Sequence, residues 1–243
     1  MNIWDFDDGV DTETVVDWCV QDREQLAADF FLIRPQFDRR PAAFWLEEFL
    51  DLQRIRVLDL PLASGQLGLC DLSSQTIYIN SNMHKFVHHK TDLVALRAST
   101  LAHEYGHLRL HALEDQENVF VRSYRDSPHF HHPRSYQRER EADLYGALFL
   151  VPLEALEKHK VVRNFLEHRV EKRHLSTVTI WKGIYRLARD FQVSPTLMKR
   201  CLFELGWLER SNKKHGDREM LRLRWNGRSI APRYSPWLGR RNR

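Results

Sequence analysis

The segment that most constrains this chain is a helix expected between residues 91 and 111, because its two faces differ in chemistry. At about 100° per residue, five side chains form an apolar stripe along one line of the helix. They are Val94, Ala98, Leu101, Tyr105 and Leu108. His103 and His107 lie on the opposite side, with Glu104 on the flank between the faces. Further leucines lie off the stripe, so we expect the helix to be covered on both sides.

Two histidines four residues apart project from neighbouring turns of a helix, so both imidazoles can reach one metal ion at about 2.0–2.1 Å. Glu104 lies about 100° around from His103 and would reach past the ion toward its bound water. Zinc lowers the pKa of such a water to about 7 and polarises a carbonyl. We therefore expect His103 and His107 to bind Zn²⁺, with Glu104 as general base. The alternative is a helix that carries histidines by chance, in a chain with 13 of them.

A zinc site of this kind needs a third ligand. The continued pattern HExxHxxGxxH is excluded, because positions 110 and 113 are Leu110 and Leu113 instead of glycine and histidine. A second helix, expected over residues 134–152 and ended by Pro152, offers a carboxylate instead.

On that second helix, Glu141 lies on a surface shared with Ala142, Tyr145 and Gly146. Small residues there, together with Gly106 on the first helix, would let the two backbones come close enough for a short carboxylate to reach the metal. Glu139 is the rival ligand, but it points about 200° away from Glu141.

The segment HEYGHLRLH, followed by EADLYG and LFLVP, resembles the ImmA/IrrE family of metallopeptidases. The family pattern is HExxHxxxH, then E-A-D/N-x-F-A leading to L-L-x-P, and the strand TIYIN before the helix also matches. The resemblance covers residues 40–155 and continues more weakly to about residue 208. Tyr145 stands where phenylalanine is usual and Gly146 where alanine is usual.

Carried over residue by residue, the resemblance implies a gluzincin-like site in which His103, His107 and Glu141 bind zinc and Glu104 is the general base. It also implies a zinc-dependent endopeptidase that makes a limited cut in a partner protein. The typical substrate would be a helix-turn-helix transcriptional repressor, in a stress, defence or mobile-element response.

Other residues are candidates for supporting roles. Asp143 is a candidate to orient one imidazole, and His111 is either a helix-end histidine favoured by the dipole or a group behind the ligands. Tyr145 is a candidate to stabilise the oxyanion. Cys70 is either a half-buried strand cysteine or, by hypothesis, a thiolate that occupies the open zinc position and keeps the enzyme latent.

The pattern along the chain predicts an α+β fold, a mostly helical zincin-like core with a small antiparallel sheet. The strands are expected in IRVLDLPL, GQLGLCD and QTIYIN, which are β-rich and separated by glycine and serine turns. We expect four parts: an acidic N-terminal helix or segment (1–35), the metallopeptidase core (36–160), a helix-turn-helix-like helical subdomain (161–209) and a basic tail (210–243).

Residues 180–209 predict helix, turn and helix, with Ser194 as N-cap, Pro195 at the first helical position and Gly206 at the end. The spacing resembles winged-helix proteins, and we favour a structural or docking role. Possible nucleic-acid contacts are Lys199 and Arg200 in this segment and Arg222 and Arg224 in the tail.

The net charge of +4 conceals an acidic N-terminus and a tail rich in lysine and arginine. Such a tail is either a solvated end or a surface for single- or double-stranded DNA. Two further interpretations therefore stay open: a DNA-binding regulator with a structural zinc, and a peptidase activated by nucleic acid at the C-terminal region. The acidic start lacks the features of a secretory signal and no stretch is apolar enough to span a membrane, so we expect a soluble, cytoplasmic protein without disulfides.

Overall fold

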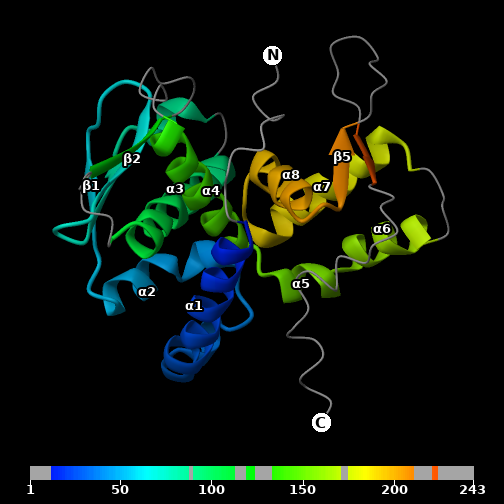
Figure 1. Ribbon diagram of the computed structural model, residues 1–243, viewed down its shortest axis with the longest axis horizontal. Coiled ribbons are helices and arrows are strands. Elements are labelled where there is room, and N and C mark those ends of the chain that lie inside the picture. Colours follow the sequence, from blue (N-terminus) through cyan, green and yellow to red (C-terminus); the bar gives the residue numbers. More distant parts are fainter. Residues whose placement is uncertain are drawn as a thin grey trace. The chain divides into compact units, whose positions relative to one another are not determined.

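The computed structural model describes residues 12–87, 90–112, 119–123, 133–170, 175–210 and 221–223 (Figure 1). The chain divides into two compact units between Pro152 and Leu153, and Phe191–Ser194 group with the first unit. The fold is α+β and mostly helical, as the sequence predicts. In the parts of the chain that the structure describes, no helix is long and apolar enough to cross a membrane. All three cysteines lie within the described residues, where they are buried and not joined in a disulfide.

The first unit contains four α-helices, three short 3-10 helices and four strands within the described residues. The α-helices are α1 (Thr12–Ile33), α2 (Leu46–Leu52), α3 (Lys90–Leu110) and α4 (Pro133–Leu150). The 3-10 helices are η1 (Pro35–Phe37), η2 (Ala42–Phe44) and η3 (Met83–Phe86). The strands are β1 (Arg56–Leu60), β2 (Gln66–Asp71), β3 (Thr76–Asn80) and β4 (Val119–Ser123).

The four strands form one mixed sheet in the order β1-β3-β2-β4. β2 runs antiparallel to β3 and β4, but β1 pairs parallel with β3, so the expectation of an antiparallel sheet is wrong for this pair. The reason is burial: β3 is buried along most of its length, whereas β1 is mostly exposed. The buried strand β3 therefore lies inside the sheet, and the exposed strand β1 lies at its edge. The chain reverses direction between β1 and β2 and again between β2 and β3, so β1 and β3 run in the same direction.

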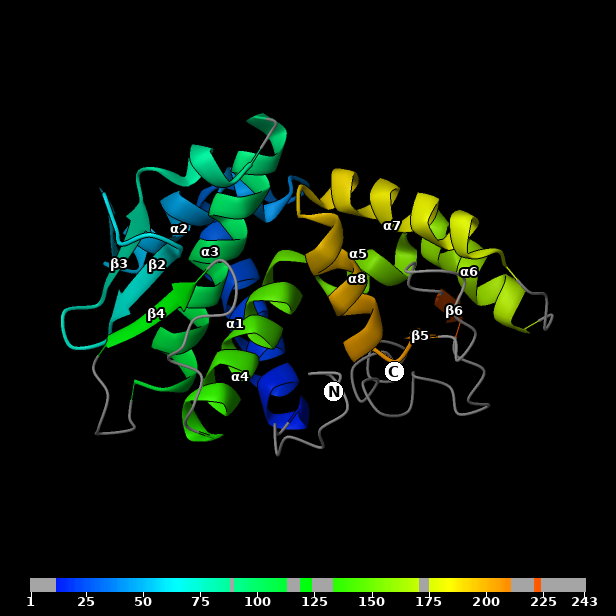
Figure 2. The same ribbon diagram turned by 90° about the horizontal axis from the view of Figure 1, so that it is seen from above.

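Helix α3 lies between the sheet and α4 (Figure 2). Leu101 and Tyr105 of the predicted stripe are buried, and so are His103, Glu104 and His107 on the other side. The expectation that the helix is covered on both faces is therefore confirmed. The buried stripe begins later than predicted, because Val94, its first residue, is 42% exposed.

Two glycines set the distance between α3 and α4. A Cβ at Gly106 would lie 3.0 Å from the carbonyl oxygen of Ala142, and a Cβ at Gly146 would lie 2.9 Å from the backbone nitrogen of His103. Real Cβ atoms essentially never come as close to backbone as a Cβ at Gly146 would, and a Cβ at Gly106 would require one helix to shift by a few tenths of an ångström. The close backbone approach predicted from these small residues is confirmed.

An aromatic cluster fills the core where α1, α2, α3 and α4 meet. Its rings lie 5.4 to 6.1 Å from their neighbours, centroid to centroid, and come from Phe30, Trp45, Phe49, Tyr105, Tyr145 and Phe149. Asp22 of α1 accepts hydrogen bonds from Arg109 of α3, at 2.6 and 2.9 Å. These contacts hold α1 against the two helices that carry the site described below.

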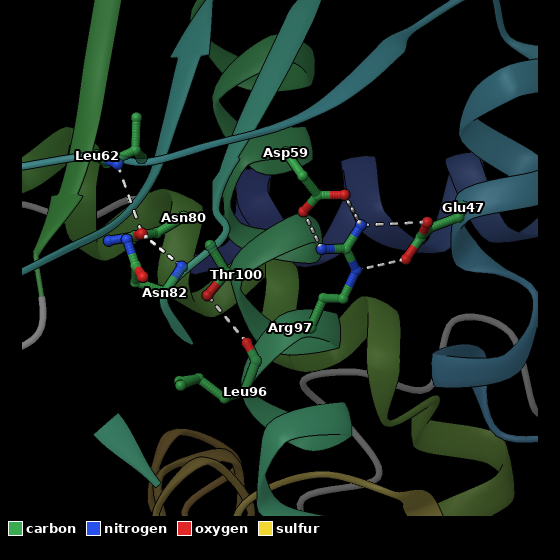
Figure 3. A network of polar contacts seen from close by, with 8 residues as sticks. All are labelled: Glu47, Asp59, Leu62, Asn80, Asn82, Leu96, Arg97 and Thr100. Carbon is green, nitrogen blue, oxygen red and sulfur yellow. Dashed lines mark hydrogen bonds and ion pairs between the residues drawn. The ribbon is translucent and has the colours of Figure 1, made fainter. Parts of the chain in front are cut away.

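Arg97 joins three elements at the other end of α3 (Figure 3). Its guanidinium donates to Glu47 of α2 at 2.7 Å and to Asp59 of β1 at 2.5 Å. Both carboxylates are about half exposed, so each pair stabilises the fold by no more than about 1 kcal/mol. The network nevertheless fixes the register of α3 relative to the edge of the sheet.

The second unit contains helices and a two-stranded antiparallel sheet. Its elements are α5 (Leu153–Lys158), α6 (Lys160–Val170), α7 (Thr177–Phe191), α8 (Pro195–Glu204), β5 (Leu208–Arg210) and β6 (Leu221–Leu223). Helices α7 and α8 follow each other closely in the predicted helix-turn-helix segment, and Gly206 has a positive φ of 67° just after α8.

The residues suggested for nucleic-acid contact are only partly described. Lys199 lies over the ring of Trp181 at 5.6 Å, and Arg200 is half-buried. Arg222 belongs to β6, but its side chain, like Arg224 and most of the basic tail, lies outside the described residues. A helix-turn-helix role for this segment stays a prediction.

Candidate metal centre

Two histidines of α3 and one glutamate of α4 converge at the junction of these helices. His103, His107 and Glu139 each offer a ligand atom, and these atoms lie within 4.8 Å of one another. The Glu139 carboxylate is 3.2 Å from Nε2 of His103 and 3.3 Å from Nε2 of His107. The two Nε2 atoms are 3.1 Å apart. Both imidazoles are almost completely buried.

The structure corrects the expected third ligand, since Glu139 and not Glu141 joins the two histidines. Ala142 and Gly146 mark the face of α4 that touches α3. Glu139 lies about 40° from the line through these two residues, whereas Glu141 lies about 120° away on the other side. The carboxylate of Glu141 instead accepts from His111 Nε2 at 3.0 Å and from Gln137 at 2.8 Å.

The charge states of these groups suit a metal ion. Burial lowers the pKa of His107 to about 4, against the opposing effect of Glu139, so this imidazole is neutral near pH 7. Burial by itself would raise the pKa of Glu139, but its contacts with His103 and His107 lower it to about 2. A neutral imidazole and an ionised carboxylate are the forms that bind metals.

Asp143, one turn after Glu139, contacts the other nitrogen of His103. Its Oδ1 lies 2.8 Å from His103 Nδ1, the contact expected of a residue that orients an imidazole. When Asp143 accepts a hydrogen bond from Nδ1–H of His103, the Nε2 atom of His103 carries no proton and faces Glu139 and His107. The carboxylate therefore directs a lone pair of His103 toward the centre of the group.

His111 stands in the same relation to His107. The Nδ1 atoms of the two rings are 3.1 Å apart, and His111 is 1% exposed just beyond the last turn of α3. Two roles were considered for His111, a helix-end histidine and a group behind the ligands. The contact with His107 favours the second role.

The three donor atoms fit Zn²⁺. Two imidazole nitrogens and a carboxylate oxygen form the donor set of catalytic zinc sites, in which a fourth position stays open to water or substrate. A cation placed among the two imidazole nitrogens and the carboxylate would be attracted by all three groups.

Glu104 is fully buried beside this group and packs against the sheet. A Cβ at Gly68 of β2 would lie only 2.7 Å from Oε1 of Glu104 and 2.6 Å from Cγ2 of Thr100. Gly68 thus makes room for the carboxylate. Gly68 was not among the residues predicted from the sequence, although a glycine inside a strand is itself a signal of a close approach.

Cys70 follows Gly68 on the same face of β2 but does not belong to the three-residue group. Its side chain is fully buried, and burial, followed by the negative charge of Glu104, raises the pKa of the thiol. A neutral thiol is a poor metal ligand. The structure therefore gives the latency hypothesis no support and favours the alternative of a buried strand cysteine.

Tyr145 points away from the metal group. Its hydroxyl donates to Asp22 of α1 at 2.5 Å, and its ring is packed in the aromatic cluster. The structure gives no support to the suggestion that Tyr145 stabilises an oxyanion, because its hydroxyl donates to Asp22 of α1.

A comparison with known protein families identifies the family of this chain. No curated protein and no solved structure matches the chain. The family of IrrE N-terminal-like domains, Peptidase_M78, matches residues 50–203, which is more than half of the chain and includes the metal group. The chain therefore belongs to this ImmA/IrrE-type peptidase family.

Proposed function

We propose that this protein is a soluble, cytoplasmic, zinc-dependent endopeptidase. The observation that carries the proposal is the convergence of His103, His107 and Glu139 within 4.8 Å, with the buried carboxylate of Glu104 adjoining them on α3. Membership of a peptidase family supports peptide-bond hydrolysis over other zinc chemistry. Three protein ligands leave one position open, which argues against a purely structural zinc site.

His103, His107 and Glu139 would hold the ion. When bound, zinc would supply Lewis acidity, which polarises a peptide carbonyl and makes water more acidic. Glu104 would accept the proton of the attacking water at its carboxylate and pass it to the nitrogen of the departing amine. One water is consumed, one C–N bond breaks, and the products are a carboxylic acid and an amine.

The substrate we propose is a partner protein, cut once or a few times. ImmA/IrrE-type relatives suggest a helix-turn-helix transcriptional repressor, in a stress, defence or mobile-element response. Co-expression with the small repressor encoded by a neighbouring gene, followed by mass spectrometry of fragments, tests this identification.

The activity itself is tested with Glu104→Gln, an isosteric change that removes the proton acceptor but none of the three metal-binding side chains. We expect this variant to keep a full equivalent of zinc and to lose cleavage. Glu48→Gln is the matched control, because Glu48 pairs with half-exposed Arg34 in the same unit. Cleavage by Glu104→Gln at the wild-type rate would refute the enzymatic role, and unchanged behaviour in every assay would favour a structural metal.

A further inference from the structure

A chain of polar contacts leads from His107 to the surface of α4. Nδ1 of His107 lies 3.1 Å from Nδ1 of His111, and Nε2 of His111 lies 3.0 Å from Oε2 of Glu141. The other oxygen of Glu141 accepts from Gln137 at 2.8 Å. His107 and His111 are buried, whereas the side chain of Glu141 is 16% exposed.

The protons in this chain have one consistent arrangement. Glu141 is an acceptor, because a carboxylate offers only lone pairs and the amide of Gln137 already donates to its other oxygen. Nε2 of His111 therefore donates to it, and Nδ1 of a neutral His111 is left without a proton. That bare nitrogen accepts from His107, so the proton of His107 sits on Nδ1 and the lone pair of His107 on Nε2.

The opposite arrangement leaves one of the two contacts of His111 without a proton. If His107 carried its proton on Nε2, the contact between the two Nδ1 atoms would need a proton on Nδ1 of His111, in addition to the one that Nε2 donates to Glu141. A neutral His111, which carries one ring proton, satisfies both contacts only when Nδ1 of His107 is the donor.

We propose that His111 and Glu141 are positioning residues that hold His107 in the tautomer whose Nε2 lone pair points into the metal group before any metal arrives. Asp143 does the same for His103 by direct contact at 2.8 Å. Two carboxylates of α4 thus hold the tautomers of the two ligands on α3. Asp143 contacts His103 directly, and Glu141 acts on His107 through His111. The inference rests on the proposed function for the identity of the metal, but not for the tautomer itself.

The first test compares His111→Asn with His111→Leu in the full-length protein. Asparagine can place a carbonyl oxygen near the site of Nδ1 and accept from His107, whereas leucine has nearly the same size and no acceptor. We expect leucine to weaken Zn²⁺ binding by about 10- to 100-fold, measured by competition with a chromophoric chelator, and asparagine to recover most of that loss. Glu48→Gln again serves as control. Equal zinc affinity of the leucine and asparagine variants would overturn the proposal.

The second test reads the tautomer of the metal-free protein from long-range ¹H–¹⁵N spectra of histidine-labelled samples. The His107 signals are assigned by their loss in His107→Gln. We expect the Nδ1-protonated form of His107 in the wild type, and a mixture of both forms in His111→Leu. An Nε2-protonated His107 in the wild type would contradict the proposal.

These readouts separate the inference from the proposed function. If the wild type binds zinc but cuts no protein, the enzymatic proposal fails, while the tautomer and the zinc affinities still decide the role of His111. If the protein cuts its substrate and the His111→Leu variant keeps wild-type zinc affinity and tautomer, the enzymatic proposal stands and the positioning role is refuted.

Discussion

Gly146 lies against the backbone of His103, so close that a Cβ at position 146 would stand 2.9 Å from the His103 nitrogen. This contact fixes both the distance and the rotation of α4 relative to α3. Glu139 precedes Gly146 by about two helical turns and so lies on the same side of α4. A contact between backbones thereby determines which carboxylate meets the two imidazoles.

Gly146→Ala tests this relationship. The new methyl group must push α4 away, and we expect the free energy of unfolding of the metal-free protein to fall by about 1–3 kcal/mol in urea titrations. Helix propensity works in the opposite direction by about 1 kcal/mol, so a net loss is diagnostic of crowding. We also expect weaker zinc binding, because Glu139 and Asp143 move with α4. A variant as stable as the wild type would show that the helices can separate without cost.

Much of the site could be predicted from the sequence because its signals are local. The spacing of His103 and His107 and the two faces of their helix depend only on helical periodicity, and the small residues Gly106 and Gly146 indicated the close approach. The α+β class and the family also follow from such patterns.

The choice between Glu139 and Glu141 could not be made in this way, because it depends on the rotation of one helix against another. Ala142 and Gly146 mark the face of α4 that contacts α3, and Glu139 lies near this face. The predicted surface also included Tyr145, and Glu141 therefore lay on it. The direction of the Tyr145 hydroxyl depends on Asp22, which lies in a helix far away in the sequence. The parallel pairing of β1 with β3 likewise depends on which strand is buried.

A paired comparison decides which glutamate is the metal ligand. Glu139→Gln removes a carboxylate 3.2 and 3.3 Å from the two Nε2 atoms, and we expect it to lose stoichiometric zinc after dialysis. Glu141→Gln should keep its zinc, because an amide oxygen can still accept from His111. Atomic absorption measures both contents, and thermal unfolding of the metal-free proteins shows that both fold. The reverse result would restore Glu141 as the ligand.

Gly68→Ala should affect catalysis without affecting the metal. The added Cβ would come within 2.7 Å of the Glu104 carboxylate and 2.6 Å of Thr100 Cγ2 and must displace them, while none of the three ligands is among its nearest neighbours. Displacement of a catalytic group by about 1 Å can cost on the order of 100-fold in rate. We therefore expect a large loss of kcat with the zinc content of the wild type. A wild-type kcat would mean that the position of Glu104 is not set by β2.

Tyr145→Phe should leave the cleavage rate unchanged, because the hydroxyl points to Asp22 and not to the metal group. The lost hydrogen bond should lower the free energy of unfolding by about 1 kcal/mol. Asp22 keeps its contacts with Arg109, which limits the loss. A fall in kcat at unchanged zinc content would contradict this placement of Tyr145.

Buried His107 should make the metal-free protein sensitive to mild acid. The pKa of its imidazole is about 4 in the folded chain, against an ordinary value of 6.5, so between these values the unfolded chain binds more protons than the folded one. The free energy of unfolding therefore falls as the pH is lowered from 6.5 to 4, by a total on the order of 3 kcal/mol. Glu139, whose pKa is about 2 when folded and 4.5 ordinarily, extends the loss below pH 4.5. Urea titrations in the presence of a chelator measure the slope, and His107→Gln should flatten it between pH 6.5 and 4. An equally steep slope in that variant would assign the acid sensitivity to other groups.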